Sequence, residues 1–264
     1  MSSALQIDQL KSRLAKLSHH ETGPEPGRFT LGMDRVDAYL DPGPCLFCLH
    51  DIHAETAADA VAANAFALGL ASRATTERPL AWVVQALACQ EAGALHGPGL
   101  HEWGLRPENV LIVRVRDATA MLAAGEEALK SGAVGAVLMS GWGEAKAMTL
   151  TASRRLALAS RAGRSTAFLV RAAAAALPSA AETRWSVRAA LSTALEAGAP
   201  GRPAFVAALT RSRQGAAPAK WTLEWDRETR AFAEPAPLSG RLVSVPVVGS
   251  VGSGGSATGF RRTG

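Results

Sequence analysis

The sequence predicts an α/β fold, in which a mainly parallel β-sheet is flanked by helices and antiparallel strands are added on the C-terminal side. Two observations predict it. Between residues 45 and 171, short and almost wholly apolar runs alternate with segments of helical composition, as parallel strands covered on both faces do. From Thr183 onward, apolar and polar residues alternate with period two, which is typical of antiparallel strands.

The composition is that of a globular protein, with 264 residues, 48% of them hydrophobic and 19% charged. No apolar run approaches the roughly 18 residues of a membrane span, and the first 20 residues carry charges where a signal peptide is apolar. Three cysteines, an odd number, argue against a disulfide framework. We therefore expect a cytoplasmic protein without membrane contact.

Residues 4–18 are predicted to form a helix with one apolar stripe, which consists of Ile7, Leu10, Leu14 and Leu17. Either the stripe folds back on its own domain or it docks onto another chain, including a second copy. Leu10, Leu14 and Leu17 are therefore candidate contact residues. A turn-rich linker follows, so the predicted organisation is a helix and linker over 1–27, a domain over 28–238 and a flexible Gly/Ser-rich tail over 239–264.

The segment 29–44 is predicted to form a short strand, a turn and a short helix that ends at Pro-Gly-Pro. The parallel strands are then expected at 45–50, 80–85, 109–115, 133–139 and 166–171, with helices at 56–74, 118–131 and 149–162.

The antiparallel strands are expected at 183–191, 203–213 and 220–226, while Pro246 makes residues 241–248 an edge strand at best. Trp185, Trp221 and Trp225 lie on the apolar faces of these strands. We interpret the three tryptophans as sheet packing rather than as platforms for single-stranded bases, because nothing marks their face as exposed.

The turn after the first parallel strand, DIHAETAAD at 51–59, is where a nucleotide-binding α/β protein keeps its phosphate loop. Such a loop needs glycines for close backbone approach and a Gly-Lys-Ser/Thr ending. This turn has neither glycine nor lysine, and Asp51, Glu55 and Asp59 would repel a triphosphate. No Gly-Lys pair occurs in the chain. We therefore expect no nucleotide cofactor.

Charge is distributed unequally along the chain. Residues 1–150 contain 12 basic and 17 acidic residues (net −5), whereas residues 151–264 contain 16 and 6 (net +10). This asymmetry favours an anionic partner for the second half. A GC-rich coding sequence would also enrich arginine, so nucleic-acid contact remains one of two interpretations.

Five arginines of the basic half are candidate contacts with a partner or DNA. Arg154 and Arg155 are adjacent on a helix and diverge by about 100°, so only one of them points into any given contact. Arg184 is expected on the strand face opposite Trp185. Arg211 and Arg213 share a strand face as a basic ridge, which either follows a nucleic-acid backbone or pairs with acidic residues of the next strand.

The remaining motifs give little support for a metal site or a catalytic site. His50 and His53 lack a third metal ligand at a defined spacing, and Cys45 and Cys48 form a lone C-x-x-C inside an apolar run. Ser140, Ser153 and Cys89 show no nucleophile elbow and no adjacent base. The sequence predicts no metal and no catalytic residue.

With these elements in order, the chain resembles the RecA/RadA-type ATPase core. FTLGMDRVDAYL matches the segment that opens that domain, and MLAAGEEALKSGAVGAVLMS matches the helix and strand of the second nucleotide motif. That strand should end in a magnesium-binding acid, but it ends in Met139-Ser140-Gly141. The family's catalytic glutamate would follow residues 80–85, where this chain has Ala86-Leu87-Ala88-Cys89. The resemblance implies a RecA-like core with a degenerate phosphate loop and no ATP hydrolysis.

A closer resemblance is to the ImuA family of RecA-like and SulA-like inducible mutagenesis proteins. It covers most of residues 28–235 and depends on the order of the blocks GPGLHEWGLRPENVLIVRVRD, EEALKSGAVGAVL, LTASRRLALASRAGRSTAFLVR, ETRWSVRAA, ALTRSRQG and WTLEWD. The glycine-rich opening of many members is short here, and the tail matches no family block.

The resemblance implies a non-catalytic accessory factor of error-prone translesion synthesis in the SOS response to DNA damage. Its implied partners are an ImuB-type Y-family-like protein and an error-prone DnaE-type polymerase, and it would associate with the nucleoid after damage. Two alternatives remain: a RecA paralogue that binds single-stranded DNA or the RecA filament, and a SulA-like inhibitor of cell division.

Overall fold

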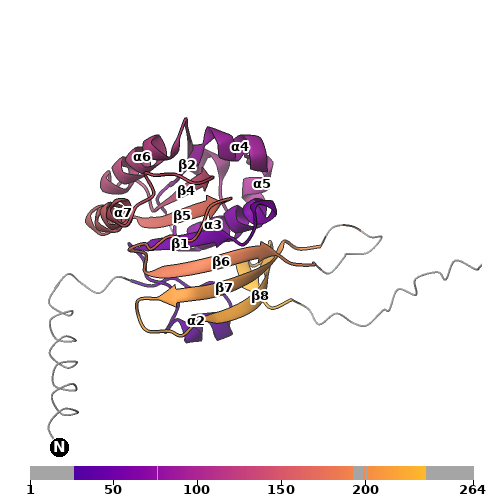
Figure 1. Ribbon diagram of the computed structural model, residues 1–264. Coiled ribbons are helices and arrows are strands. Elements are labelled where there is room, and N and C mark those ends of the chain that lie inside the picture. The colour runs from indigo at the N-terminus through magenta and orange to yellow at the C-terminus, as the bar shows by residue number, and fades with distance from the viewer. Residues whose placement is uncertain (1–26, 76, 193–198, 200, 236–264) are drawn as a thin grey trace, which may run out of the picture.

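The computed structural model describes residues 27–75, 77–192, 199 and 201–235. These residues form one nine-stranded sheet between two layers of helices (Figure 1). The strand order is β3-β2-β4-β5-β1-β6-β7-β8-β9. Neighbours from β3 to β6 are parallel, and those from β6 to β9 are antiparallel. The predicted α/β class, with antiparallel strands added at the C-terminal side, is confirmed.

The strands are β1 (Leu49–Ala54), β2 (Leu80–Gln85), β3 (Val110–Val115), β4 (Ala136–Trp142), β5 (Thr166–Ala172), β6 (Thr183–Ala189), β7 (Ala204–Ser212), β8 (Ala219–Asp226) and β9 (Ala231–Ala233). The helices are α2 (Asp34–Tyr39), α3 (Ala60–Ala74), α4 (Ala86–Ala92), α5 (Gly97–Glu102), α6 (Ala118–Lys130) and α7 (Leu150–Gly163), with 3₁₀ turns η1 (Ala57–Asp59) and η2 (Pro107–Asn109).

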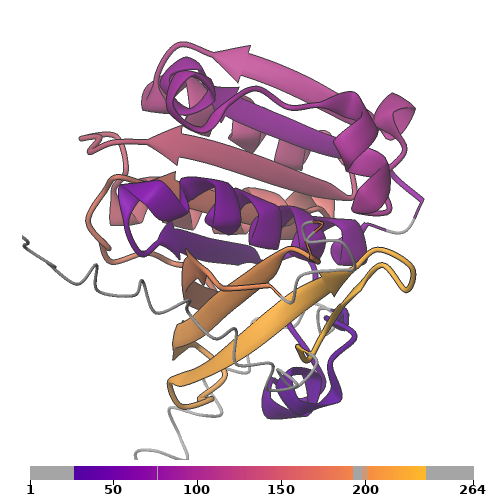
Figure 2. The same cartoon turned by 90° about the vertical axis from the view of Figure 1, so that its right-hand side faces the viewer.

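Each face of the sheet has its own hydrophobic core. Helices α3, α4 and α5 lie on one face and α6 and α7 on the other (Figure 1), and Figure 2 looks onto the α3 side. The α3 side contains the aromatic residues, among them the fully buried Trp185 and Trp225. The α6–α7 side is built from smaller aliphatic residues such as Val137 and Leu169. The interpretation of Trp185 and Trp225 as core residues is confirmed.

Helices α6 and α7 begin at side-chain caps and pack closely together. The Asp117 carboxylate accepts a hydrogen bond from the Ala120 N–H at 2.9 Å, and the Thr149 hydroxyl accepts one from the Ala152 N–H at 3.1 Å. At the end of α7, a Cβ on Gly163 would lie 1.8 Å from the Leu129 carbonyl oxygen. Only glycine allows this approach of the two helices.

Several sequence expectations need correction. The short strand expected within 29–44 is only an isolated bridge between Arg28 and Cys45, and the strand expected at 133–139 is Ala136–Trp142. The first parallel strand is Leu49–Ala54 rather than 45–50, so Asp51 and His53 are buried strand residues and not part of the turn. The strand β3 is not covered on both faces, because it is the sheet edge and exposes Leu111 and Ile112. The short helices α4 and α5 were not predicted, since neither shows a helical apolar repeat.

The predicted helix over 4–18, with Leu10, Leu14 and Leu17, lies outside the described residues, as do the tail over 239–264 and the edge strand over 241–248. Within the described ranges, no helix has the length and apolar character needed to cross a membrane.

Candidate functional site

The turn between β1 and α3 is closed by a carboxylate of the chain itself. One oxygen of Asp59 accepts hydrogen bonds from the Thr56 N–H at 3.1 Å and the Thr56 hydroxyl at 2.6 Å. Its other oxygen accepts one from the Ala189 N–H of β6 at 3.0 Å. Burial alone would raise the pKa of Asp59, but these hydrogen bonds hold it below its ordinary value. The Asp59 carboxylate therefore already occupies the Thr56 N–H in the turn where a phosphate loop would hold its phosphate.

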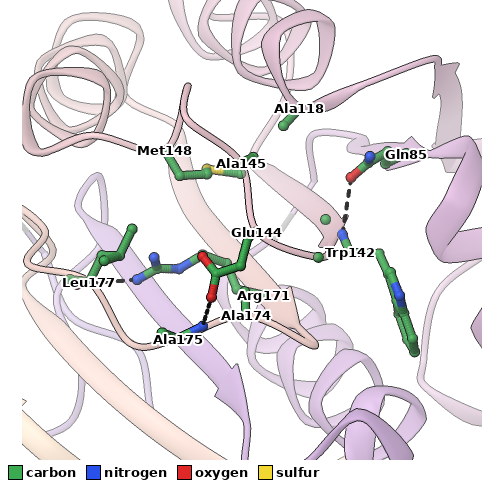
Figure 3. Close-up of a pocket in the computed structure, with 12 residues that line it drawn as sticks. Gln85, Ala118, Trp142, Glu144, Ala145, Met148, Arg171, Ala174, Ala175 and Leu177 are labelled. Carbon is green, nitrogen blue, oxygen red and sulfur yellow. Dashed lines mark hydrogen bonds between the residues drawn. The ribbon is translucent and has the colours of Figure 1, made fainter.

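The ends of β2 and β4 are also closed by hydrogen bonds. Ser140 lies where the RecA-type resemblance expects a magnesium-binding acid, and it is 2% exposed. Its hydroxyl accepts from the Trp82 indole N–H at 2.8 Å and donates to the Asn64 side-chain oxygen at 2.5 Å. The Gln85 side-chain oxygen accepts from the Trp142 N–H at 3.0 Å (Figure 3).

The pocket beside these strand ends is small. It is bordered by Gln85 of β2, Arg171 of β5 and the loop after β4, whose Glu144 carboxylate accepts from the Ala175 N–H at 2.7 Å (Figure 3). Its volume of about 10 Å³ is room for no more than one water molecule. Ligands of open α/β sheets bind at the carboxyl ends of the strands, and this small pocket has no room for one. A larger cavity of about 260 Å³ lies on the α3 side, and Trp82, Val84 and Ser140 are among its lining residues.

Behind the small pocket lies a buried cluster of charges around Asp51, which has no exposed surface. Arg171 donates two hydrogen bonds to the two oxygens of Asp51, at 3.2 and 2.7 Å. Ser179 donates another at 2.7 Å, and Arg184 Nε lies 3.6 Å away. Arg171 also lies 2.7 Å from His53 Nε2, a ring nitrogen that is itself 3.4 Å from an Asp51 oxygen.

The Asp51 cluster links β1, β5 and β6, and it explains why Arg184 points into the protein rather than toward a partner. Burial alone would raise the pKa of Asp51, but the His53 hydrogen bond and the Arg171 charge outweigh it and lower that pKa. The structure directs Arg184 into this cluster, where its guanidinium also donates to Ser179 at 3.1 Å. A charged residue within an apolar strand indicates an oppositely charged partner elsewhere in the chain, because burying a charge without one costs free energy.

The arginines that the structure brings together line a cleft beside α7. Arg154 and Arg161 of α7 face Arg213, which follows β7, across a cavity of about 260 Å³. The floor and rim also include Glu182 and Leu158, the latter 65% exposed. We call this cavity the basic cleft. Arg161 follows Arg154 by seven residues, a helical spacing that places both on one face.

Arg155 does not face the basic cleft. It lies 2.5 Å from the Glu126 carboxylate of α6, which Lys130 also approaches at 2.6 Å. The predicted divergence of Arg154 and Arg155 is thus confirmed. Arg211 is exposed at the end of β7 beside Arg184. It does not pair with Glu224, because the register places Glu224 opposite Ala204, at the other end of β7.

The histidines and cysteines near β1 are packed in the interior. Burial lowers the pKa of His50 to about 4, and its ring nitrogens contact the Thr183 hydroxyl at 2.8 Å and the Cys45 carbonyl at 2.9 Å. A hydrogen bond from Cys48 lowers the pKa of Cys45 to about 7, against the effect of burial. Among the residues described, no group of three or more His, Cys, Asp or Glu side chains is arranged to hold a metal ion.

In comparisons with known proteins, neither a protein-family model nor a curated protein matches this chain.

Proposed function

We propose that this chain is a non-catalytic, RecA-like accessory factor of error-prone translesion DNA synthesis. It would recruit an ImuB-type Y-family-like protein and an error-prone DnaE-type polymerase to a stalled primer end. Recruitment of this kind works by raising the effective concentration of the polymerase at its substrate. The proposal is supported by the order of the sequence blocks in which the chain resembles the ImuA family, and by a mainly parallel sheet with added antiparallel strands.

The observation that carries the non-catalytic part is the Asp59 carboxylate at the start of α3. An NTPase keeps free backbone N–H groups there for phosphate, whereas here the Thr56 N–H of the turn donates to Asp59, as does the Ala189 N–H of the neighbouring strand β6. A triphosphate would also meet the Glu55 carboxylate in the same turn. Electrostatic repulsion and occupied donors therefore act together against nucleotide binding.

We expect ATP with Mg²⁺ to leave the melting temperature of the protein unchanged, because binding to the native state alone would raise it. Differential scanning fluorimetry at increasing ATP concentrations measures this directly. A saturable rise in melting temperature that requires Mg²⁺ would contradict the proposal and favour an ATPase with an unusual loop.

The partner surface that we assign to the accessory function is the basic cleft. Arg154 is a better contact than Arg155, since the Arg155 guanidinium is already paired with Glu126 while Arg154 lines the cavity. The exposed Leu158 adds an apolar contact between the arginines. In protein interfaces, arginines are enriched among the few residues that contribute most of the binding free energy.

We expect the Arg154→Gln/Arg213→Gln variant to bind the ImuB-type protein at least about tenfold more weakly, because two cleft arginines lose their charge. The matched control is Arg155→Gln, which changes the neighbouring arginine outside the cleft. Co-elution and titration calorimetry with the full chain measure both. Equal binding by the two variants would remove the basic cleft from the interface.

The second candidate, direct binding of single-stranded DNA, is favoured by the same cluster of cleft arginines. Such binding would weaken steeply with salt, and loss of two phosphate contacts would lower the salt slope by about 1.4. Single-stranded DNA binding by the purified chain without complex formation with the ImuB-type protein would favour this function over the accessory one.

A further inference from the structure

Two cysteines form a hydrogen-bonded pair in the turn that leads into β1. In a strand, residues three positions apart point to opposite faces. The strand β1 begins only at Leu49, however, and Leu46 and Phe47 form a turn between Cys45 and Cys48. The first and last Cα atoms of such a turn lie within about 7 Å, a separation that a disulfide can span. The two thiols are hydrogen-bonded to each other, with no disulfide between them.

The backbone of this turn is fixed against β5. The Ala167 N–H donates to the Cys48 carbonyl at 2.9 Å, and the Phe47 N–H donates to the Thr166 hydroxyl at 3.0 Å. These contacts involve main-chain groups of the turn and a side chain of β5, so none of them depends on the sulfur atoms. The turn therefore holds the two thiols together whether or not they are bonded.

Both cysteines are buried, but each lies next to a group that faces solvent. Cys48 lines the basic cleft, a cavity of about 260 Å³. Cys45 contacts the side chain of Gln214, which is exposed and donates a hydrogen bond from Nε2 to the Cys45 Sγ. A molecule as small as a peroxide therefore reaches the pair from the cleft or after displacement of one exposed side chain.

We propose that Cys45 and Cys48 are a redox site in the wall of the basic cleft, where a peroxide converts the two thiols to a disulfide. This inference does not depend on the proposed function. The Cys45 thiolate attacks one peroxide oxygen, so that an S–O bond forms, the O–O bond breaks and hydroxide leaves. The Cys48 sulfur then attacks the Cys45 sulfur, and the S–O bond breaks as the S–S bond forms. The Cys48 proton leaves with the hydroxyl group as water, and the peroxide has gained the two electrons that the cysteines lose.

The surroundings give the two cysteines different roles. The hydrogen bond from Cys48 lowers the pKa of Cys45 to about 7 against the effects of burial and of the Glu182 charge. The charge of Arg28 and the hydrogen bond from Gln214 act in the same direction as Cys48. The same hydrogen bond between the thiols, together with burial, raises the pKa of Cys48. Cys45 is thus the thiolate that attacks, and Cys48 is the thiol that resolves the sulfenic acid.

Oxidation of the pair alters the basic cleft. A disulfide carries no thiolate charge, so the negative charge of Cys45 next to the cleft is lost. The hydrogen bond that the Cys45 thiolate accepts from Gln214 is weakened as well, and Gln214 directly follows Arg213 of the cleft. The oxidation state of the two cysteines therefore changes the charge at the surface that carries the arginines.

Treatment of the reduced full chain with stoichiometric hydrogen peroxide tests the proposal. We expect the loss of two of the three thiols, measured by thiol titration after denaturation. The intact mass should fall by two hydrogen atoms, and peptide mapping should place this loss on Cys45 and Cys48 without added oxygen. Dithiothreitol should restore both thiols. If the native protein keeps these two thiols while Cys89 gains oxygen, the proposal is overturned.

Three variants test the assigned roles. Cys48→Ser should stop at the sulfenic acid of Cys45, which dimedone traps, and Cys45→Ser should give neither a disulfide nor an adduct on Cys48. The matched control is Cys89→Ser, which removes the half-buried third cysteine and should still lose two thiols. Thermal melting shows whether each variant folds, and the wild-type mass change stands without them. A dimedone adduct on Cys48 in Cys45→Ser, with none on Cys45 in Cys48→Ser, would overturn the assigned order of attack.

Discussion

Replacement of Asp51 by alanine is expected to lower the free energy of unfolding by about 3–5 kcal/mol, because it leaves the buried Arg171 and the partly buried Arg184 without their counter-charge. Arg171 is 5% exposed, so water replaces little of the lost interaction. Urea denaturation measures the change. The control is Glu55→Ala, which removes an exposed carboxylate 3.7 Å from Arg188 and should change stability by no more than about 0.5 kcal/mol.

The same cluster predicts part of the pH dependence of stability. The pKa of Asp51 is lower in the folded state than in the unfolded chain. Its contribution is therefore fully present above the unfolded pKa of about 3.9 and is lost as the pH falls through the folded pKa. Asp51→Asn should show a smaller loss of stability below about pH 4 than the wild type. Parallel acid profiles for the two proteins would contradict the assignment.

Replacement of Trp225 by alanine is expected to cost about 3–5 kcal/mol of folding free energy. Its ring is fully buried, stacks on Trp103 at 4.7 Å between centroids, and meets Phe232 edge-on at 5.1 Å. Its indole N–H donates to the Glu102 carbonyl at 2.8 Å, which fixes the end of α5 against β8. The substitution removes a large volume and one hydrogen bond together.

Two further variants test whether the loss of stability is specific to the buried Trp225 ring. Trp225→Phe keeps most of the volume but loses the N–H donor, so it should cost less than Trp225→Ala. Trp221→Ala removes a half-buried ring that contacts Tyr39 at 5.2 Å, and we also expect a smaller loss there. A Trp225→Ala loss below about 1 kcal/mol, measured by urea denaturation, would contradict its place in the core.

Most of the fold followed from local patterns. Apolar runs such as those of β2 and β5 predict strands that are covered on both faces of the sheet. The period-two alternation around Trp185 and Trp225 predicts strands with one buried face, because successive side chains point to opposite faces. The strand β1 was misplaced for a physical reason. Asp51 and His53 make its second half polar, and that polarity is tolerated only because Arg171, 120 residues away from Asp51, pairs with it.

The candidate site was predictable only in part. Helical geometry alone separates Arg154 from Arg155 by about 100°. Which of the two faces a partner depends on Glu126 of α6, since that carboxylate takes Arg155 and leaves Arg154 in the cleft. Arg213 joins the cleft because its N–H donates to the Glu182 carbonyl, a contact between segments that strand pairing brings together.

The amino-acid sequence by itself determined the α/β class, the change from parallel to antiparallel strands, and the lack of glycine and lysine in the turn before α3, since these depend on neighbouring residues. Tertiary structure alone decided that Asp59 also binds the Ala189 N–H of β6, that Arg184 is drawn to Asp51, and that β3 forms an exposed edge. Each of these depends on groups distant in the chain, whose meeting is set by the strand order of the sheet.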